Sequence, residues 1–337
     1  MPVKDLSPPA RIVIIGAAVV IVLAGIRAAT PILGPFLVAV FFAMITAPAM
    51  AWLRRRGVPP AIAAGAVVTG LIGILVGAAL FLGAALRQFL LSLPRYLAAL
   101  ERQTAGYGIS PEDFRIWDFV DQGTVIQQAA GLARDVGNIA LDAFLVAIAI
   151  AFLLLEAPRL TAGLKRRFGA ENNLYRHFSQ SGRILIDYVI VRTKVNLVTG
   201  TGTGIFLYIF GIEFAALWGF VAFVLSYVPY IGLVVAAIPP TLLALVSFGP
   251  AGAVTVIIAI AIIDAAAENL VFPQIASQGL NLSPFVVLFS VLFWALILGA
   301  VGVFLAIPLT IAVKLFLESW EETRWIGEMM NAKDQEE

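Results

Sequence analysis

Fifty consecutive residues without a charged side chain decide the fold of this protein, residues 214–263: FAALWGFVAFVLSYVPYIGLVVAAIPPTLLALVSFGPAGAVTVIIAIAII. A helix needs about 20 apolar residues to cross the ~30 Å hydrocarbon core of a bilayer, so this stretch is long enough for two crossings. Lipid cannot hydrogen-bond to the backbone, and a spanning segment therefore has to satisfy its own amides, as a helix does. The stretch predicts a helical membrane protein.

The composition of the whole chain has the same character. Of its 337 residues, 61% are hydrophobic and 13% are charged, and the mean hydropathy is +0.97. A soluble domain carries roughly 25% charged residues, so a water-soluble globule is excluded. The net charge of +1 gives no electrostatic reason to expect nucleic acid as a partner. We expect the partner to be the lipid bilayer.

Other charge-free runs supply the remaining helices. They predict an all-α polytopic membrane protein with about eight transmembrane helices, of which the first is a retained helix rather than a cleaved signal. The runs are residues 12–26, 28–53, 57–86, 143–155, 195–212, two helices within 214–263, and 269–313.

The basic residues predict the orientation, because Lys and Arg of short loops stay on the cytoplasmic side. Arg54, Arg55 and Arg56 follow the second run, and eight basic residues lie between residues 159 and 194. Residues 87–142 have the opposite balance, with seven acids and five bases. We therefore expect both termini inside and residues 87–142 outside.

The outer segment begins with apolar residues at helical spacing, from Phe89 to Leu100. We expect this face to lie against the membrane or a neighbouring subunit, which makes a homo-oligomer an expectation. We also expect Pro94 to interrupt the segment.

The chain lacks the residues that several kinds of function require. No Lys follows a Gly, so the phosphate-binding loop of an ATP-driven pump is absent. The chain has no Cys and one His, His177, which excludes disulfides and thiolate or His-rich metal sites. We predict a protein that is not an enzyme and holds neither a metal centre nor a cofactor.

Two acids at the end of the long apolar stretch are the candidate functional groups. Asp264 and Glu268 are four residues apart and share one helical face. Two close carboxylates beside a bilayer disfavour joint ionisation, so one of them can carry a proton. Asn269 and Gln274 add polar groups. The alternative is that the helix ends at residue 263 and that both acids are in water, since Pro273 follows closely.

Two similar segments, Gly232 to Pro239 and Gly302 to Pro308, each place a Gly before Ala-Ile-Pro. Corresponding Gly/Pro-interrupted segments are typical of transporters whose site lies between repeats. The alternative is that the two segments are similar by chance, because chance similarity is common in so apolar a composition. If residues 214–247 and 284–313 form re-entrant hairpins, the chain has six transmembrane helices plus two hairpins.

Gly200 and Gly204 lie four residues apart within a Thr-Gly repeat. The spacing is that of a small-x-x-x-small face, so we expect it to support close helix packing rather than to line a pathway.

With these motifs together, the chain resembles the autoinducer-2 exporter family of bacterial membrane proteins. The motifs that carry the resemblance are Pro229-Tyr230-Ile231-Gly232, Glu268-Asn269-Leu-Val-Phe-Pro273, Leu280-Asn-Leu-Ser-Pro284 and Gly299-Ala-Val-Gly302-Val-Phe-Leu-Ala-Ile-Pro308. The resemblance implies a multi-pass inner-membrane protein that exports small molecules, among them the quorum-sensing signal autoinducer-2, or that exchanges sodium for protons.

We therefore predict a secondary transporter that exports a small molecule or exchanges a cation for protons by alternating access. A non-transporting scaffold and a passive channel remain the alternatives. The proposed coupling residues are Glu268 and Asp264, and the proposed substrate or pathway residues are Asn269, Gln274, Pro229, Tyr230, Gly232, Pro273, Gly302 and Pro308.

The prediction divides the chain into five parts. They are residues 1–86 with three helices, the outer segment 87–142, residues 143–194 with the fourth helix and the basic cytoplasmic stretch, the transport core 195–317 with broken helices, and the cytoplasmic tail 318–337.

Overall fold

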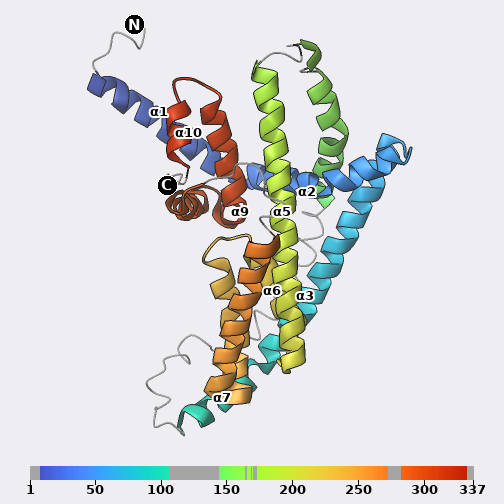
Figure 1. Ribbon diagram of the computed structural model, residues 1–337, viewed down its shortest axis with the longest axis vertical. Coiled ribbons are helices and arrows are strands. Elements are labelled where there is room, and N and C mark those ends of the chain that lie inside the picture. Colours follow the sequence, from blue (N-terminus) through green and yellow to red (C-terminus); the bar gives the residue numbers. More distant parts are fainter. Residues whose placement is uncertain are drawn as a thin grey trace. The chain divides into compact units, whose positions relative to one another are not determined.

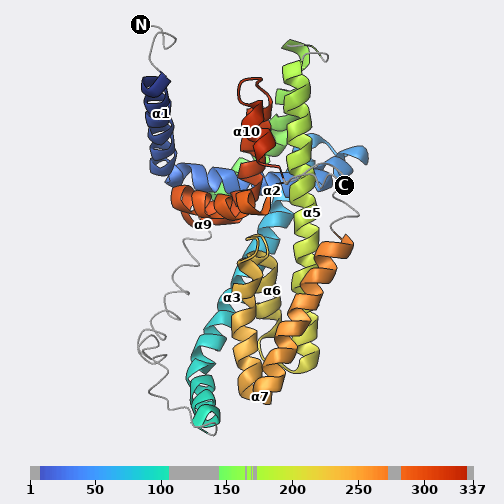
Figure 2. The ribbon, with the colours of Figure 1, turned by 60° about the vertical axis from the view of Figure 1, so that its left-hand side comes forward.

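The computed structural model describes residues 8–105, 144–163, 165–167, 169, 173–271 and 282–331, and these are almost entirely helical (Figures 1 and 2). No strand occurs within these ranges, which confirms the all-α prediction. Besides a helix within residues 144–167, the elements are α1 (Pro8–Ala28), α2 (Thr30–Arg55), α3 (Pro60–Ala105), α5 (Asn173–Phe210), α6 (Ala215–Leu225), α7 (Gly232–Ala266), the π-helical turn η4 (Ala267–Val271), α9 (Pro284–Glu318) and α10 (Arg324–Met329).

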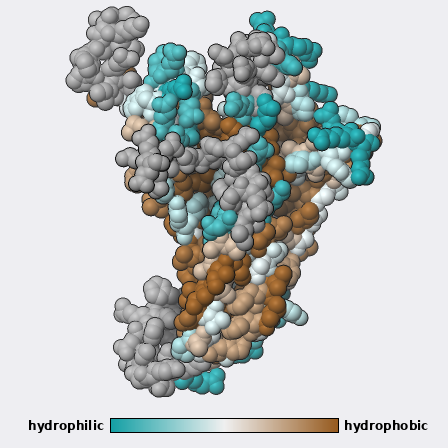
Figure 3. Space-filling model, viewed as in Figure 1, coloured by the Kyte–Doolittle hydropathy of each residue, from teal (hydrophilic) through white to brown (hydrophobic). Residues whose placement is uncertain are grey.

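By length and composition, five helical stretches in the described part of the chain are long and apolar enough to cross a membrane. Two shorter apolar helices, Gly16–Ala28 and Ala215–Leu225, accompany them. Figure 3 shows hydrophobic residues covering the lower part of the visible face, where α3 and α7 lie in Figure 1. The protein is therefore a multi-pass membrane protein. The five long helices are Thr30–Arg55, Pro60–Leu100, Phe144–Arg167, Gly232–Asn269 and Pro284–Glu318.

The chain forms two compact units, one of residues 1–41 and 281–337 and the other of residues 42–280. In the first unit, Thr30 of α2 donates a hydrogen bond to the carbonyl of Ile297 of α9, and Phe41 packs edge-on against Phe304. In the second unit, α5, α6 and α7 pack together with α3 (Figure 2). The acidic residues singled out in the sequence belong to the second unit.

Each unit contains one long helix that reverses direction at a glycine. Gly249 of α7 has φ 70° and ψ −169°, and Gly299 of α9 has φ 62° and ψ −140°. Glycine adopts such angles without the steric cost that a Cβ atom brings. Across the two arms of α9, the Trp294 indole N–H donates to the Thr310 hydroxyl at 3.0 Å. The predicted breaks in the charge-free stretches are confirmed, and the structure places them at these glycines and in the turn at residues 226–231.

The arms of α7 are short for a transmembrane helix. Each has roughly 17 residues and a length of about 25 Å at 1.5 Å per residue, less than the ~30 Å hydrocarbon core. The length favours a re-entrant hairpin, but its place differs from the expected one: the sequence put the first hairpin within residues 214–247, and the arms that meet at Gly249 belong to Gly232–Ala266. Backbone at the tip of such a hairpin is tolerated where it is buried in protein or borders water.

Gly232 and Gly302 occupy similar positions in the two units. Each lies in the first turn after a break, and a Cβ atom on either would overlap the carbonyl oxygen of a residue seven or eight positions earlier, Leu225 or Trp294. The sequence similarity between the two segments thus has a physical basis, because the returning helix starts against the end of the previous one.

The prediction that Gly200 and Gly204 support close packing is confirmed. A Cβ atom on Gly200 would lie 2.7 Å from the carbonyl oxygen of Gly219 on α6 and 2.5 Å from Phe223 Cβ. Gly219 in turn approaches Gly204, so the backbones of α5 and α6 touch along one turn of each helix.

The expectation for the start of the outer segment was wrong in two respects. Helix α3 continues through Pro94 to Ala105. Tyr96 is buried, and Phe89 packs edge-on against Trp218 and Phe214, near the start of α6, rather than on lipid or another subunit. The Tyr96 hydroxyl and the Arg95 guanidinium also donate hydrogen bonds to the Glu213 carboxylate. These contacts hold α3 in place on both sides of the proline, which lacks a backbone N–H and whose ring crowds the carbonyl four residues earlier.

We expect Gly200→Ala to destabilise the protein by about 1–3 kcal/mol, because the added methyl group has to push apart two backbones. The thermal unfolding midpoint in detergent, followed by tryptophan fluorescence, measures this. Gly70→Ala on α3 is the matched control, since nothing lies within 4 Å of a Cβ atom there. Equal midpoints for the two variants would contradict the packing account.

Candidate functional site

The site lies where α7 changes into η4. Asp264 occupies the last turns of α7, and Glu268 occupies the π-helical turn that follows. π-Helical turns are rare and occur frequently at functional positions, because the extra residue changes the direction in which side chains point.

Arg192 of α5 joins three elements at this point. Its Nη1 donates to Glu268 Oε1 at 2.5 Å, and its Nη2 donates to the carbonyl of Ser226, which caps the end of α6. The side chain of Arg192 is 14% exposed and that of Glu268 is 34% exposed, so the pair is largely withdrawn from solvent. A pair of this kind fixes the ends of α6 and α7 relative to α5.

A second contact strengthens this junction. The Tyr227 hydroxyl donates to Thr193 Oγ1 at 2.7 Å, and Thr193 donates to the carbonyl of Val189 within α5. The turn between α6 and α7 is thus attached to α5 at two successive residues, Ser226 through its main-chain carbonyl and Tyr227 through its side-chain hydroxyl.

Polar side chains continue from Arg192 along one face of α5. Asn196, Thr199 and Thr203 follow at intervals of four, three and four residues, which places all four side chains on the same side of the helix. Asn196 and Thr199 are 0% exposed, Thr203 is 1% exposed, and their side-chain polar atoms have no hydrogen-bond partner within the described part of the chain. Buried groups without partners are rare in native proteins.

Asp264 lies one turn before Glu268 and faces this polar line. Its carboxylate interacts electrostatically with Glu268 and Arg192 and lies close to the Thr199 hydroxyl. Arg192 forms its ion pair with Glu268, and Asp264 lies beside that pair without an ion pair of its own among the described residues. The excess negative charge in this largely buried region has to be neutralised by a proton or a cation when the site is closed to water.

The other residues expected at a site are distributed differently. Asn269 is exposed and donates its amide to the Ala265 carbonyl within the same helix, while Pro273 and Gln274 lie outside the described residues. Pro229, Tyr230 and Gly232 form the turn that leads into α7, where Tyr230 has φ 63°. Gly302 and Pro308 belong to α9, in the first compact unit.

Arg192 and the polar face of α5 were missed in the sequence. The sequence shows Arg192 as one of the basic residues that indicate orientation, and Arg192, Asn196, Thr199 and Thr203 also follow one another at helical spacing in a largely apolar segment. That spacing is the signal that could have identified them.

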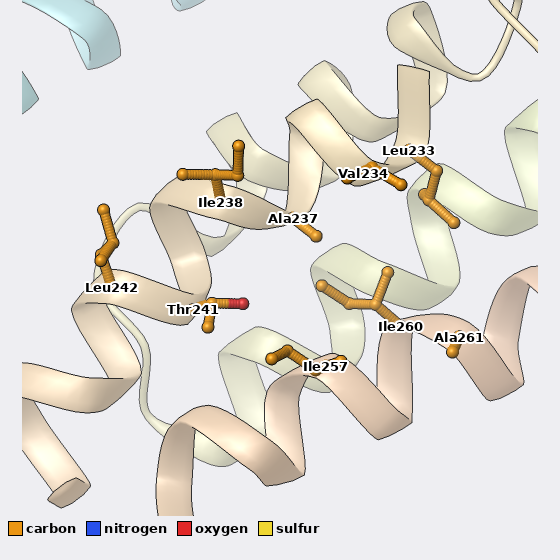
Figure 4. Close-up of a pocket in the computed structure, with 9 residues that line it drawn as sticks. All are labelled: Leu233, Val234, Ala237, Ile238, Thr241, Leu242, Ile257, Ile260 and Ala261. Atoms are coloured by element: carbon orange, nitrogen blue, oxygen red, sulfur yellow. The ribbon is translucent and has the colours of Figure 1, made fainter. Parts of the chain in front are cut away.

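An apolar pocket of about 370 Å³ lies between the two arms of α7 (Figure 4). The Thr241 hydroxyl is its polar group, and it has no hydrogen-bond partner within the described residues. Ile260 and Ala261 of the second arm line the pocket and lie one turn before Asp264. The second arm therefore borders an apolar space and carries the acidic site.

Comparison with known proteins agrees with this architecture. Residues 16–322 match the family described as AI-2E family transporter. The chain belongs to this family. It is 32% identical to the AI-2 transport protein TqsA of Escherichia coli K12, over 91% of the chain and 92% of TqsA. It is 30% identical to the putative transport protein YhhT of the same strain, over 90% and 89%, and 29% identical to a putative transport protein of Haemophilus influenzae, over 91% and 92%. The resemblance stated from the motifs is thus confirmed, and the protein is a member of a family of membrane transport proteins.

We expect Arg192→Met to destabilise the protein by about 3–5 kcal/mol, because it leaves Glu268 as an uncompensated, partly buried charge. The double variant Arg192→Met/Glu268→Met should recover most of the loss. Thermal unfolding in detergent measures both. Glu328→Gln, which removes the acid of the exposed pair with Arg324, is the control and should have little effect. A double variant as unstable as Arg192→Met alone would show that the loss of stability does not come from an unpaired Glu268 carboxylate.

Proposed function

We propose that the protein is a secondary transporter that exports a small molecule, or exchanges sodium or another cation for protons, by alternating access. The observation that carries the proposal is the charge imbalance of the site, where Arg192 is paired with Glu268 and Asp264 remains beside them. Obligatory coupling of transport to a proton or cation requires an acid that has to bind that ion before the site can close.

The broken helices supply the movement. Gly249 and Gly299 are positions where a helix reverses direction, and the Pro229–Gly232 turn precedes the first arm of α7. Discontinuous helices next to a midplane site are the parts that move in many secondary transporters. The walls that open alternately are therefore the segments around Pro229–Gly232 and Gly302–Pro308, and Asn269, Gln274 and Pro273 follow the coupling acids in sequence.

The cargo suggested by the family is a molecule like autoinducer-2, since a relative of similar length carries the name AI-2 transport protein. Family membership leaves open which molecule an individual member moves. A passive channel and a membrane scaffold that binds partner proteins are the competing functions, and transport assays separate all three.

We expect Asp264→Asn and Glu268→Gln to abolish coupled exchange, because the first removes the acid without an ion pair and the second removes the partner of Arg192. The measurement uses purified protein in liposomes with an internal pH dye, while an inward or outward sodium gradient is imposed. Asp187→Asn, on an exposed position of α5, is the matched control and should exchange at the wild-type rate.

Other outcomes of this assay contradict the proposal. Conductance without obligatory exchange indicates a channel. No flux of sodium, protons or autoinducer-2 in either direction indicates a scaffold. Full exchange by the Glu268→Gln variant would remove that residue from the coupling mechanism.

We further propose that the protein lies in the bacterial inner membrane with both termini in the cytoplasm. The chain has no Cys, so single cysteines report the topology directly. A membrane-impermeant maleimide should label Arg102→Cys, at the exposed end of α3, in spheroplasts that are still intact. Glu321→Cys should be labelled only after the membrane is permeabilised. The reverse pattern would invert the topology.

A further inference from the structure

The carboxylates of Glu268 and Asp264 differ in whether a basic side chain already neutralises their charge. Glu268 forms an ion pair with Arg192, whose second nitrogen is occupied by the Ser226 carbonyl. Within the part of the chain that the structure describes, Asp264 forms no ion pair. The carboxylate of Asp264 is thus the one that is available to a charged ligand.

Asn196 and Thr199 are neutral oxygen donors beside it. Both are completely buried. The Asn196 amide finds no hydrogen-bond partner among the described residues, and the Thr199 hydroxyl has only the nearby Asp264 carboxylate to interact with. Leaving a buried group such as the Asn196 amide unsatisfied costs roughly 1–3 kcal/mol, which points to a ligand that satisfies it in the working protein.

The register of the helices brings these oxygens to one place. Arg192 on α5 contacts Glu268, and Thr199 on the same face lies close to Asp264, so α5 and the second arm of α7 run antiparallel. Asn196 lies between Arg192 and Thr199 on that face, about 4.5 Å of helix rise from Thr199. Ile263 packs against Gly202 and closes the region next to Asp264 with hydrocarbon.

We propose that Asp264, Thr199 and Asn196 form a binding site for one dehydrated monovalent cation, of which Na⁺ is the natural candidate. Carboxylate, hydroxyl and amide oxygens are hard ligands that suit hard cations rather than soft metals. A single unpaired carboxylate matches one positive charge, and it repels anions. The inference deepens the proposed function, on which its role in transport rests, by separating the two acids: Asp264 holds the ion, and Glu268 positions the helices through Arg192.

The test is direct binding of ²²Na⁺ to the full chain in detergent, measured by scintillation proximity. We expect saturable binding that unlabelled NaCl displaces and choline chloride does not. Thr199→Val keeps the shape of the side chain, removes its oxygen, and should weaken binding by about tenfold or more. Asp264→Asn should abolish it.

Thr201→Val is the matched control. Thr201 lies two residues away on the exposed side of α5, and its hydroxyl is satisfied by the Leu197 carbonyl, so this variant should bind like the wild type. Size-exclusion profiles establish whether each variant is folded. If Asp264→Asn does not fold, the Thr199→Val variant alone tests the proposal.

Two results overturn the proposal: an absence of saturable ²²Na⁺ binding, which would assign the buried groups to water, or unaltered binding by Thr199→Val. The outcome is separable from that of the transport assay. Binding without exchange in liposomes would refute the proposed transport and leave the site standing, whereas exchange without binding would do the opposite.

Discussion

A guanidinium enclosed by apolar helices has to be neutralised, and in this protein that requirement holds three elements together. Arg192 extends from α5 to the carboxylate of Glu268 in η4 and to the last carbonyl of α6. Removal of either charge would leave the other without compensation in a region of low dielectric constant. The junction of α5, α6 and α7 therefore depends on one side chain, and the polar line on α5 begins from it.

The sequence predicted well those features that depend on local composition. Charge-free runs gave an all-helical membrane protein, and the Gly and Pro residues within them indicated that two stretches are broken. The position of each break was less evident, because the φ and ψ angles at Gly249 and Gly299 depend on what the returning arm packs against. A composition rich in glycine does not reveal which glycine reverses the chain.

Contacts between distant residues were where the sequence failed. Arg192 and Glu268 are 76 positions apart, and Tyr96 and Glu213 are 117 apart. Counting charges locates Arg192 near a membrane surface without showing that it turns inward. An apolar face such as that of Phe89 and Tyr96 likewise shows that something covers it, and the structure identifies that cover as α6 of the same chain. Of the candidate site, the sequence therefore supplied the two acids, while the cation and the neutral donors came from the fold.

The contact between Gly200, Gly204 and Gly219 has a consequence for how the protein can change shape. Two helices whose backbones touch without intervening side chains have no room to slide or tilt, since a shift of a fraction of an ångström would bring main-chain atoms into collision. Helices α5 and α6 should therefore travel as a single rigid body. Any rearrangement of this region has to be absorbed at its edges, in the Tyr230 turn and at Gly249, where the chain departs from helical dihedral angles.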